Sequence, residues 1–177
     1  MRIGIISDSH GQRDLLVAAV SALAGRGAQA IIHCGDFADP DDIALLWRPG
    51  LAAYAVGGNM DRHYLDELAD RAGAAHVVFS TELVTVDIGG GRHLAATHGH
   101  DESLLEELIV AQQFAYVCHG HTHSVRDDRF HDVRVINPGP LYHSRRPGYP
   151  TAALLDTDTD ALTVFRVEAA KGSRREP

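Results

Sequence analysis

The chain has 177 residues, the size of one ordinary domain, and its 16 Lys and Arg against 24 Asp and Glu give a net charge of −8. Apolar residues make up 45% and charged residues 23%, which excludes a disordered, collagen-like or coiled-coil chain. A domain that binds nucleic acid through many phosphates is expected to be basic, so we expect no stable nucleic-acid complex. The unusual feature of the composition is its 12 histidines.

The cysteine pattern and the amino-terminal segment indicate in which cellular compartment the protein is expected. Cys34 and Cys118 lie far apart in apolar runs, so they predict no disulfide framework and fit a reducing environment. The first apolar stretch is too short for a signal peptide and is interrupted by Asp8. The longest apolar helical segment, residues 15–24, is too short to span a bilayer. We therefore expect a soluble, cytoplasmic protein without a membrane partner.

Short apolar runs alternate with segments of helical period in the first half of the chain. The runs have the length of strands buried on both faces, and they cover residues 3–6, 30–34 and 51–56. Helices are expected over residues 16–23, 41–47 and 64–72. This alternation predicts parallel strands joined by crossover helices.

The second half of the chain is mostly of the strand type. Residues 82–88 and 93–97 surround three glycines and predict a hairpin. Ser103 and Glu106 have capping-box spacing at the start of a helix with one apolar face. Further strands are expected over residues 115–118, 125–130, 133–136, 151–156 and 161–167. The pattern predicts a mixed α/β sandwich in one domain, residues 1–168, followed by a flexible tail, residues 169–177.

Polar side chains follow the carboxyl end of successive apolar runs, which is the edge where open α/β sheets bind ligands. The residues that stand there are Asp8, His10, Asp36, Asn59, His98, His100, His121, His123 and Asn137. Six of the histidines fall between His93 and His123, where even spacing would place about two. Because imidazole is the commonest metal ligand, the cluster indicates a metal site. His33, inside an apolar run, is expected to have a structural role.

The types of the candidate ligands narrow the choice of metal. Carboxylate, imidazole and amide groups without a thiolate suit manganese, iron, zinc, nickel or cobalt better than calcium. In extended chain, residues two apart point to the same side, so Asp8 with His10 and His121 with His123 are each expected to present two ligands together. Seven of these residues are candidate ligands, namely Asp8, His10, Asp36, Asn59, His98, His121 and His123. Seven ligands are too many for one four-coordinate zinc but suit two ions that share one carboxylate. Two divalent ions and two aspartates leave a positive site that attracts an anion such as a phosphate ester.

Five motifs in order carry a resemblance to a known family. They are Asp8-x-His10, Gly35-Asp36, Gly58-Asn59, His98-Gly99-His100 and Gly120-His121-Thr122-His123. This series resembles the calcineurin-like metallophosphoesterase superfamily, and the run Ile136-Asn137-Pro138-Gly139 is similar to its small prokaryotic phosphodiesterase branch. The resemblance covers about residues 1–168.

The resemblance implies a fold, a cofactor and an activity. The implied fold is a four-layer α-β-β-α sandwich with two mixed β-sheets. The implied cofactor is a pair of divalent transition metal ions, with manganese preferred and nickel, zinc, iron or cobalt as alternatives. The implied ligands are Asp8, His10 and His123 for the first ion and Asn59, His98 and His121 for the second, with Asp36 between them. The implied activity is hydrolysis of a small phosphate ester, with phosphodiesters favoured over phosphomonoesters, by a hydroxide that bridges the ions.

The sequence departs from the superfamily at the leaving-group position. The fourth motif of the superfamily often reads Gly-Asn-His-Asp or Gly-Asn-His-Glu, but this chain has Met60 after Asn59. Because methionine cannot donate a proton, poor leaving groups are expected to react slowly. His100 is the candidate that could replace the missing acid.

Two other functions are compatible with parts of this pattern. The superfamily includes a retromer coat subunit that has the fold but has lost key groups, so a non-catalytic interaction scaffold is the alternative, supported by Met60 and opposed by the complete ligand set. A single-zinc hydrolase acting on amides is disfavoured by the seven ligands. The sequence does not specify the natural substrate or the oligomeric state.

Overall fold

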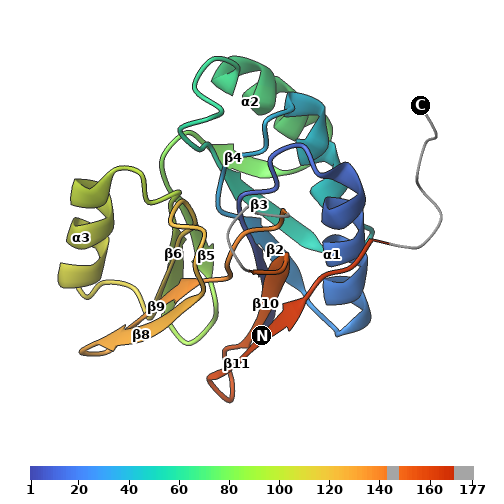
Figure 1. Cartoon of the computed structure of the whole chain (residues 1–177). Coiled ribbons are helices and arrows are strands. Elements are labelled where there is room, and N and C mark those ends of the chain that lie inside the picture. Colours follow the sequence, from blue (N-terminus) through green and yellow to red (C-terminus); the bar gives the residue numbers. More distant parts are fainter. Residues whose placement is uncertain (143–147, 170–177) are drawn as a thin grey trace, which may run out of the picture.

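The computed structural model describes residues 1–142 and 148–169, which form two β-sheets with helices on their outer faces (Figure 1). The segment 143–147 lies outside the described residues, as does nearly all of the tail that the sequence predicts. None of the helices in the described part of the chain is long and apolar enough to cross a membrane.

The larger sheet has six strands in the order β11-β10-β1-β2-β3-β4. Its strands are β1 (Arg2–Ile6), β2 (Ala30–His33), β3 (Ala52–Val56), β4 (Val78–Ser80), β10 (Thr151–Asp156) and β11 (Ala161–Arg166). The first four strands run parallel, and the β10–β11 hairpin adds antiparallel strands beside β1. All four parallel strands therefore end at one edge of the sheet.

The smaller sheet has five strands in the order β5-β6-β7-β9-β8. Its strands are β5 (Val84–Asp87), β6 (His93–Ala96), β7 (Tyr116–Cys118), β8 (Arg126–Phe130) and β9 (Val133–Asn137). The central strands β6, β7 and β9 run parallel, while β5 and β8 are antiparallel edge strands. Both sheets are thus mixed.

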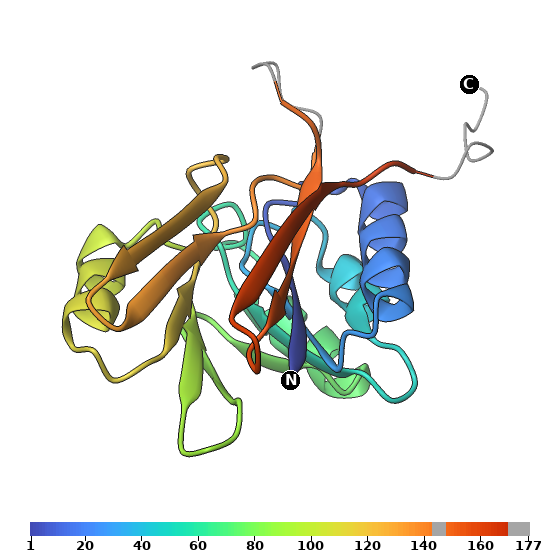
Figure 2. The ribbon, with the colours of Figure 1, turned by 90° about the horizontal axis from the view of Figure 1, so that it is seen from below.

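The helices cover the outer faces. They are α1 (Arg13–Gly25), the 3-10 helix η1 (Pro40–Leu46), α2 (Leu65–Ala74) and α3 (Glu102–Val110). Figure 2 shows α1, in blue, and α3, in yellow-green, on opposite outer sides of the two sheets. The four-layer α-β-β-α sandwich that the resemblance implied is confirmed.

Alternation along the strands separates three apolar cores, one for each interface between layers. On β1, Ile6 packs in the core beneath α1 and α2, while Ile3 and Ile5 face the core between the sheets. On β6, Leu94 faces the core between the sheets and Ala95 faces α3. The central strands β1, β2, β7 and β9 are buried on both faces, so most of them read as continuous apolar runs in the sequence, whereas the edge strand β8 is exposed and polar.

The local structure differs from the predicted elements at three places. The strand β4 was not predicted, because three residues carry no detectable period. The predicted helix over residues 41–47 is a 3-10 helix that begins at Pro40. The predicted capping box at Ser103 is wrong, because Asp101 caps α3 and accepts a hydrogen bond from the Leu104 N–H at 3.1 Å. A carboxylate at a helix amino terminus also interacts favourably with the helix dipole.

The ends of the two sheets that lie away from the candidate ligands are joined by Arg134. Its guanidinium donates to both Asp127 carboxylate oxygens, at 2.7 and 2.9 Å, and to Asp160 in the β10–β11 turn, at 2.9 Å. The Arg134 side chain is only 11% exposed. Hydrogen bonding to Arg134 lowers the pKa of Asp127; for Asp160, burial raises the pKa, but the bonds from Arg134 and Tyr116 outweigh it.

We predict that Arg134→Met lowers the free energy of unfolding by about 1–2 kcal/mol at pH 7, because it removes a bidentate pair and a bond between the sheets. Because the pKa of the Asp127 carboxyl is lowered in the folded state, its pairing stabilises the protein at pH values above its ordinary pKa of 3.8. This contribution is lost as the pH falls from 3.8 through the pKa of the folded state. The difference between wild type and variant should therefore shrink at pH 3, as measured by urea unfolding. The control Arg126→Met removes an exposed pair within β8 and should cost less than about 0.5 kcal/mol. An Arg134→Met effect no larger than that of the control would contradict the prediction.

Candidate metal centre

The predicted ligands lie at the carboxyl ends of parallel strands in both sheets. Asp8 and His10 follow β1, Asp36 follows β2 and Asn59 follows β3. From the smaller sheet, His98 follows β6, and His121 and His123 follow β7. Because the two sheets pack face to face, these loops meet at one end of the sandwich.

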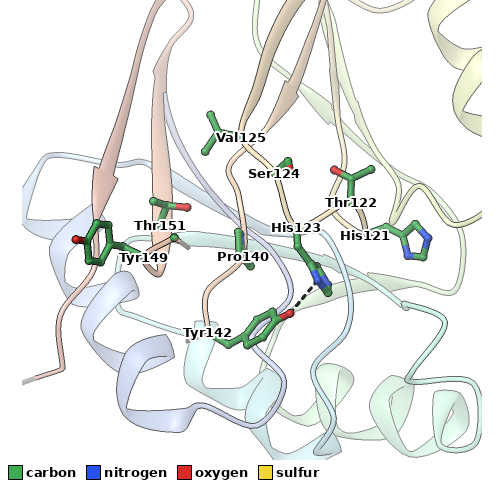
Figure 3. A pocket seen from close by; sticks show the side chains of 10 residues that line it. His121, Thr122, His123, Ser124, Val125, Pro140, Tyr142, Tyr149 and Thr151 are labelled. Carbon is green, nitrogen blue, oxygen red and sulfur yellow. Dashed lines mark hydrogen bonds between the residues drawn. The ribbon is translucent and has the colours of Figure 1, made fainter. Parts of the chain in front are cut away.

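The backbone at this edge is left-handed at five of the seven candidate ligands. The residues with positive φ are Asp8 (54°), His10 (45°), Asp36 (62°), His121 (65°) and His123 (53°). Such a conformation costs about 1 kcal/mol or more for a residue with a Cβ, and Asp and His tolerate it better than most residue types. The premise of extended chain is therefore wrong, because each of these loops turns sharply, although Asp8 and His10 do present their ligand atoms in one group. Figure 3 shows the consequence for one pair, since the rings of His121 and His123 point in different directions.

Backbone hydrogen bonds between the loops hold these turns. The N–H groups of Asp8 and His10 donate to the carbonyls of Gly35 and Asp36, both at 3.0 Å. A Cβ at Gly58 would lie 2.1 Å from Asp36 Oδ1, so only glycine allows this approach. A Cβ at Gly120 would lie 1.7 Å from Ser7 Oγ, which makes the same demand on the loop after β7.

One group of ligand atoms gathers around Asp8. The donor atoms of Asp8, His10, Asp36 and His123 all lie within 4.8 Å of one another. His123 Nε2 is 3.2 Å from Asp8 Oδ1 and 3.3 Å from His10 Nε2, and His10 Nε2 is 3.8 Å from Asp36 Oδ2. This group corresponds to the first set of ligands that the resemblance implied, together with Asp36.

A second group lies on the other side of Asp36. His98 Nε2 is 3.4 Å from Asp36 Oδ1 and 3.0 Å from Asn59 Oδ1. The His121 ring is 5.2 Å from the His98 ring, centroid to centroid. His98 Nδ1 lies 2.7 Å from the Cys34 carbonyl and donates to it, which leaves the Nε2 lone pair of the neutral ring facing the two oxygens. Three electron-rich atoms thus converge where a cation would satisfy all of them.

The pKa shifts of Asp8, Asp36, His10 and His121 favour the forms that bind metal ions, whereas that of His98 favours the protonated ring. Burial lowers the pKa of His10 and of His121 more than the nearby carboxylates raise it. Burial also opposes ionisation of Asp8 and Asp36, but hydrogen bonds and neighbouring imidazoles outweigh it and lower both pKa values. For His98 burial disfavours the charged form, yet pairing with Asp36 raises the pKa. Ionised carboxylates and neutral imidazoles are the forms that bind metal ions.

The spacing of the donor atoms fits divalent transition metal ions. Metal–ligand distances of about 2.0–2.2 Å place neighbouring ligands roughly 2.8–3.6 Å apart for octahedral or tetrahedral angles. The separations of 3.2 and 3.3 Å in the first group, and of 3.0 and 3.4 Å in the second, lie in this range. The residues present therefore fit the cofactor that the resemblance implies.

Asp61, which the sequence analysis did not select, holds the loop that carries Asp36. Its buried carboxylate accepts hydrogen bonds from the N–H groups of Asp36, Phe37, Ala38 and Gly58, at 2.8–3.2 Å. The Tyr64 hydroxyl donates a further bond at 3.0 Å. A weak signal was present, since an acidic residue follows Met60 directly. Asp61 therefore fixes two ligand loops without itself facing the cluster.

Two further residues, Tyr142 and His33, support a ligand or the loops that carry the ligands. The Tyr142 hydroxyl lies 2.9 Å from His123 Nδ1, which directs His123 Nε2 toward the cluster. Nothing in the sequence pattern identified Tyr142. His33 has the structural role that was expected: it stacks on Phe37, it lies 3.1 Å from Ser9 Oγ, and burial lowers its pKa to about 3.

The remaining candidates lie near the cluster. Asn137 donates to the Gly120 carbonyl at 2.7 Å and accepts from the Gly139 N–H at 2.8 Å, so it supports the loop after β7. The exposed His100 ring is 5.3 Å from the His98 ring. Met60 is 53% exposed, and its backbone N–H donates to Asp36 Oδ1 at 2.9 Å.

The fold and the site together define an α/β protein with a carboxylate–imidazole cluster at the strand ends of two facing sheets. A family model described as the calcineurin-like phosphoesterase superfamily domain matches residues 1–160. The chain therefore belongs to the calcineurin-like phosphoesterase superfamily, a family whose members use divalent metal ions, and the resemblance drawn from the motifs is confirmed.

This chain is similar to a known phosphodiesterase and to solved structures of the same fold. The phosphodiesterase MJ0936 of Methanocaldococcus jannaschii is 31% identical over 160 residues, which cover 89% of this chain and 94% of that protein. A solved structure of a novel archaeal phosphodiesterase superposes with a TM-score of 0.81 and 28% identity, over 95% of this chain and all of the other. Wild-type Vps29 of Entamoeba histolytica, solved with Zn²⁺, has a TM-score of 0.58 and 18% identity over 96% of this chain and 94% of its own, and shows the fold alone.

We predict that Asp61→Asn lowers the free energy of unfolding by about 2–4 kcal/mol, because an amide turns one or more donors toward buried N–H groups. Denaturant unfolding measures this loss. Asp70→Asn, at an exposed position on α2, is the matched control and should change stability by less than about 0.5 kcal/mol. Equal stability of the two variants would show that the Asp61 carboxylate does not hold the loops.

Proposed function

We propose that this protein is a dinuclear metal-dependent phosphodiesterase. Membership of the superfamily and the phosphodiesterase relative support a hydrolase that acts on small phosphate esters. The observation that carries the dinuclear proposal is the position of Asp36, whose two carboxylate oxygens face different groups. Its Oδ2 faces His10 at 3.8 Å, and its Oδ1 faces His98 at 3.4 Å.

The proposed ligands divide between the two groups. Asp8, His10 and His123 would hold one ion, while Asn59, His98 and His121 would hold the other. Asp36 would touch both ions. Manganese is our first choice of metal, with nickel, zinc, iron or cobalt as alternatives, because the donors are oxygen and imidazole nitrogen. When bound, such a pair acidifies water and polarises a phosphoryl group.

The side chains of the protein would hold the ions, attract the substrate and protonate the leaving oxygen. The aspartates and histidines of the cluster would hold the ions, and the positive site that results would attract a phosphate ester to a protein of net charge −8. His100, exposed beside His98, is our candidate for the group that protonates the leaving oxygen. Met60 occupies the rim next to Asn59 and cannot supply this proton. The buried free thiols of Cys34 and Cys118 support a reducing, cytoplasmic location.

We predict that the purified protein binds about two transition metal ions per chain, and that Asp36→Asn reduces both metal content and phosphodiester hydrolysis, the latter by roughly 100-fold or more. Metal analysis after dialysis and assays with Mn²⁺, Ni²⁺ and Zn²⁺ measure these quantities. His131→Ala, an exposed histidine of the β8–β9 turn, should leave both unchanged. A metal-free protein without hydrolytic activity would favour the interaction-scaffold alternative.

We also predict faster hydrolysis of aryl phosphodiesters than of alkyl phosphomonoesters, because a good leaving group needs no acid. Met60→His should raise turnover of an alkyl monoester such as glycerol phosphate by about 10-fold or more and change an aryl diester little. Met60→Leu has similar size and no proton, so it should give no gain. His100→Gln should slow the alkyl substrate more than the aryl one. Wild-type turnover of glycerol phosphate that matches the aryl diester would overturn the proposal for Met60.

A further inference from the structure

Tyr142, which is not a proposed ligand, contacts two histidines of the first group of ligand atoms. Its hydroxyl lies 2.9 Å from His123 Nδ1, as the dashed line in Figure 3 marks. Its ring also meets the rings of His123 and His10 edge to face, with centroids 5.1 and 4.7 Å apart. One half-buried side chain outside the ligand set therefore contacts two of the three residues proposed for the first ion alone.

The direction of the Tyr142 hydrogen bond follows from what His123 must present to a metal ion. His123 Nε2 lies 3.2 Å from Asp8 Oδ1 and 3.3 Å from His10 Nε2, so this nitrogen faces the cluster. A neutral imidazole carries one proton, and a ring nitrogen binds a cation only through a free lone pair. In the metal-binding form the proton is therefore on Nδ1, which donates to the Tyr142 oxygen. By accepting this bond, Tyr142 stabilises the tautomer of His123 that can act as a ligand.

The matching histidine of the second group has a different kind of acceptor. His98 Nδ1 donates to the Cys34 carbonyl at 2.7 Å, and the His98 side chain is fully buried. The His123 side chain is 33% exposed, and its partner is a hydroxyl on a separate loop. A backbone carbonyl is present whatever the residue type, whereas a hydroxyl is lost when the residue changes. The first group therefore depends on an acceptor that a single substitution removes.

We propose that Tyr142 is a positioning residue for His123, and that it raises the affinity of the first group for its ion without acting on the second group. This inference rests on the proposed function, because it takes each group to bind one ion. It makes the two ions unequal, since occupancy of the first group depends on one hydroxyl. Hydrogen-bond partners of metal-binding histidines contribute about 10–100-fold to metal affinity.

Tyr142→Phe removes the hydroxyl and keeps the ring beside His10 and His123. Calorimetric titration of the metal-depleted protein with Mn²⁺ should give two ions bound per chain in the wild type. In Tyr142→Phe one ion should bind about 10–100-fold more weakly, and the other should keep its affinity. Tyr149→Phe is the matched control: this residue is 59% exposed and its ring packs on Arg166, so neither affinity should change.

A second variant separates the positioning of His123 from a general effect on the fold. His123→Ala should weaken one ion, and adding Tyr142→Phe should cause no further loss, because the hydroxyl then has no imidazole to orient. Three results would each overturn the proposal: a loss that persists in the His123→Ala background, an equal loss for both ions, or no loss in Tyr142→Phe.

An activity assay distinguishes this proposal from the proposed function. Two bound ions, one of them dependent on Tyr142, without hydrolysis of bis-p-nitrophenyl phosphate would reject the phosphodiesterase and retain the positioning role. Hydrolysis by the wild type, with both Mn²⁺ affinities unchanged in Tyr142→Phe, would do the reverse.

Discussion

The two buried carboxylates of Asp8 and Asp36 set the physical constraint at this site. Their oxygens lie within one group of atoms no more than 4.8 Å apart. Two like charges at this separation in a site with little water repel each other strongly unless positive charge lies between them. The imidazoles of His10, His98 and His123 have their Nε2 atoms toward the carboxylates, and burial lowers the pKa of His10. The two carboxylates and the rings around them are thus arranged as ligands for cations.

This constraint explains why the strain in the loops is tolerated. Left-handed backbone at Asp8, Asp36 and His123 brings their side chains into one small volume, and each such turn costs free energy. The bonds between loops and the Asp61 carboxylate offset that cost, because they satisfy N–H groups that the turns would otherwise leave buried without partners. The ligands also come from both sheets. The cluster therefore exists only when the apolar core between the sheets has formed, a core that includes Ile5 and Leu94. Folding and assembly of the site are therefore one process.

All the strands except β4, the α-helices and the edge of the sheets at which the ligands gather could be predicted from local patterns, because apolar runs and polar residues at strand ends are visible in the sequence. What could not be predicted depends on contacts between distant segments. The sign of φ at His10 and His123 follows from hydrogen bonds and packing between loops, so an argument from extended chain was the wrong basis for pairing ligands. Tyr142 reaches His123 across 19 residues, and no spacing rule connects them.

The fold is shared with Vps29 at 18% identity, so fold alone does not distinguish a hydrolase from other uses of this sandwich. The distinction lies in the side chains at the strand ends, where the set of proposed metal ligands favours a hydrolase and Met60, which cannot donate a proton, favours the scaffold alternative.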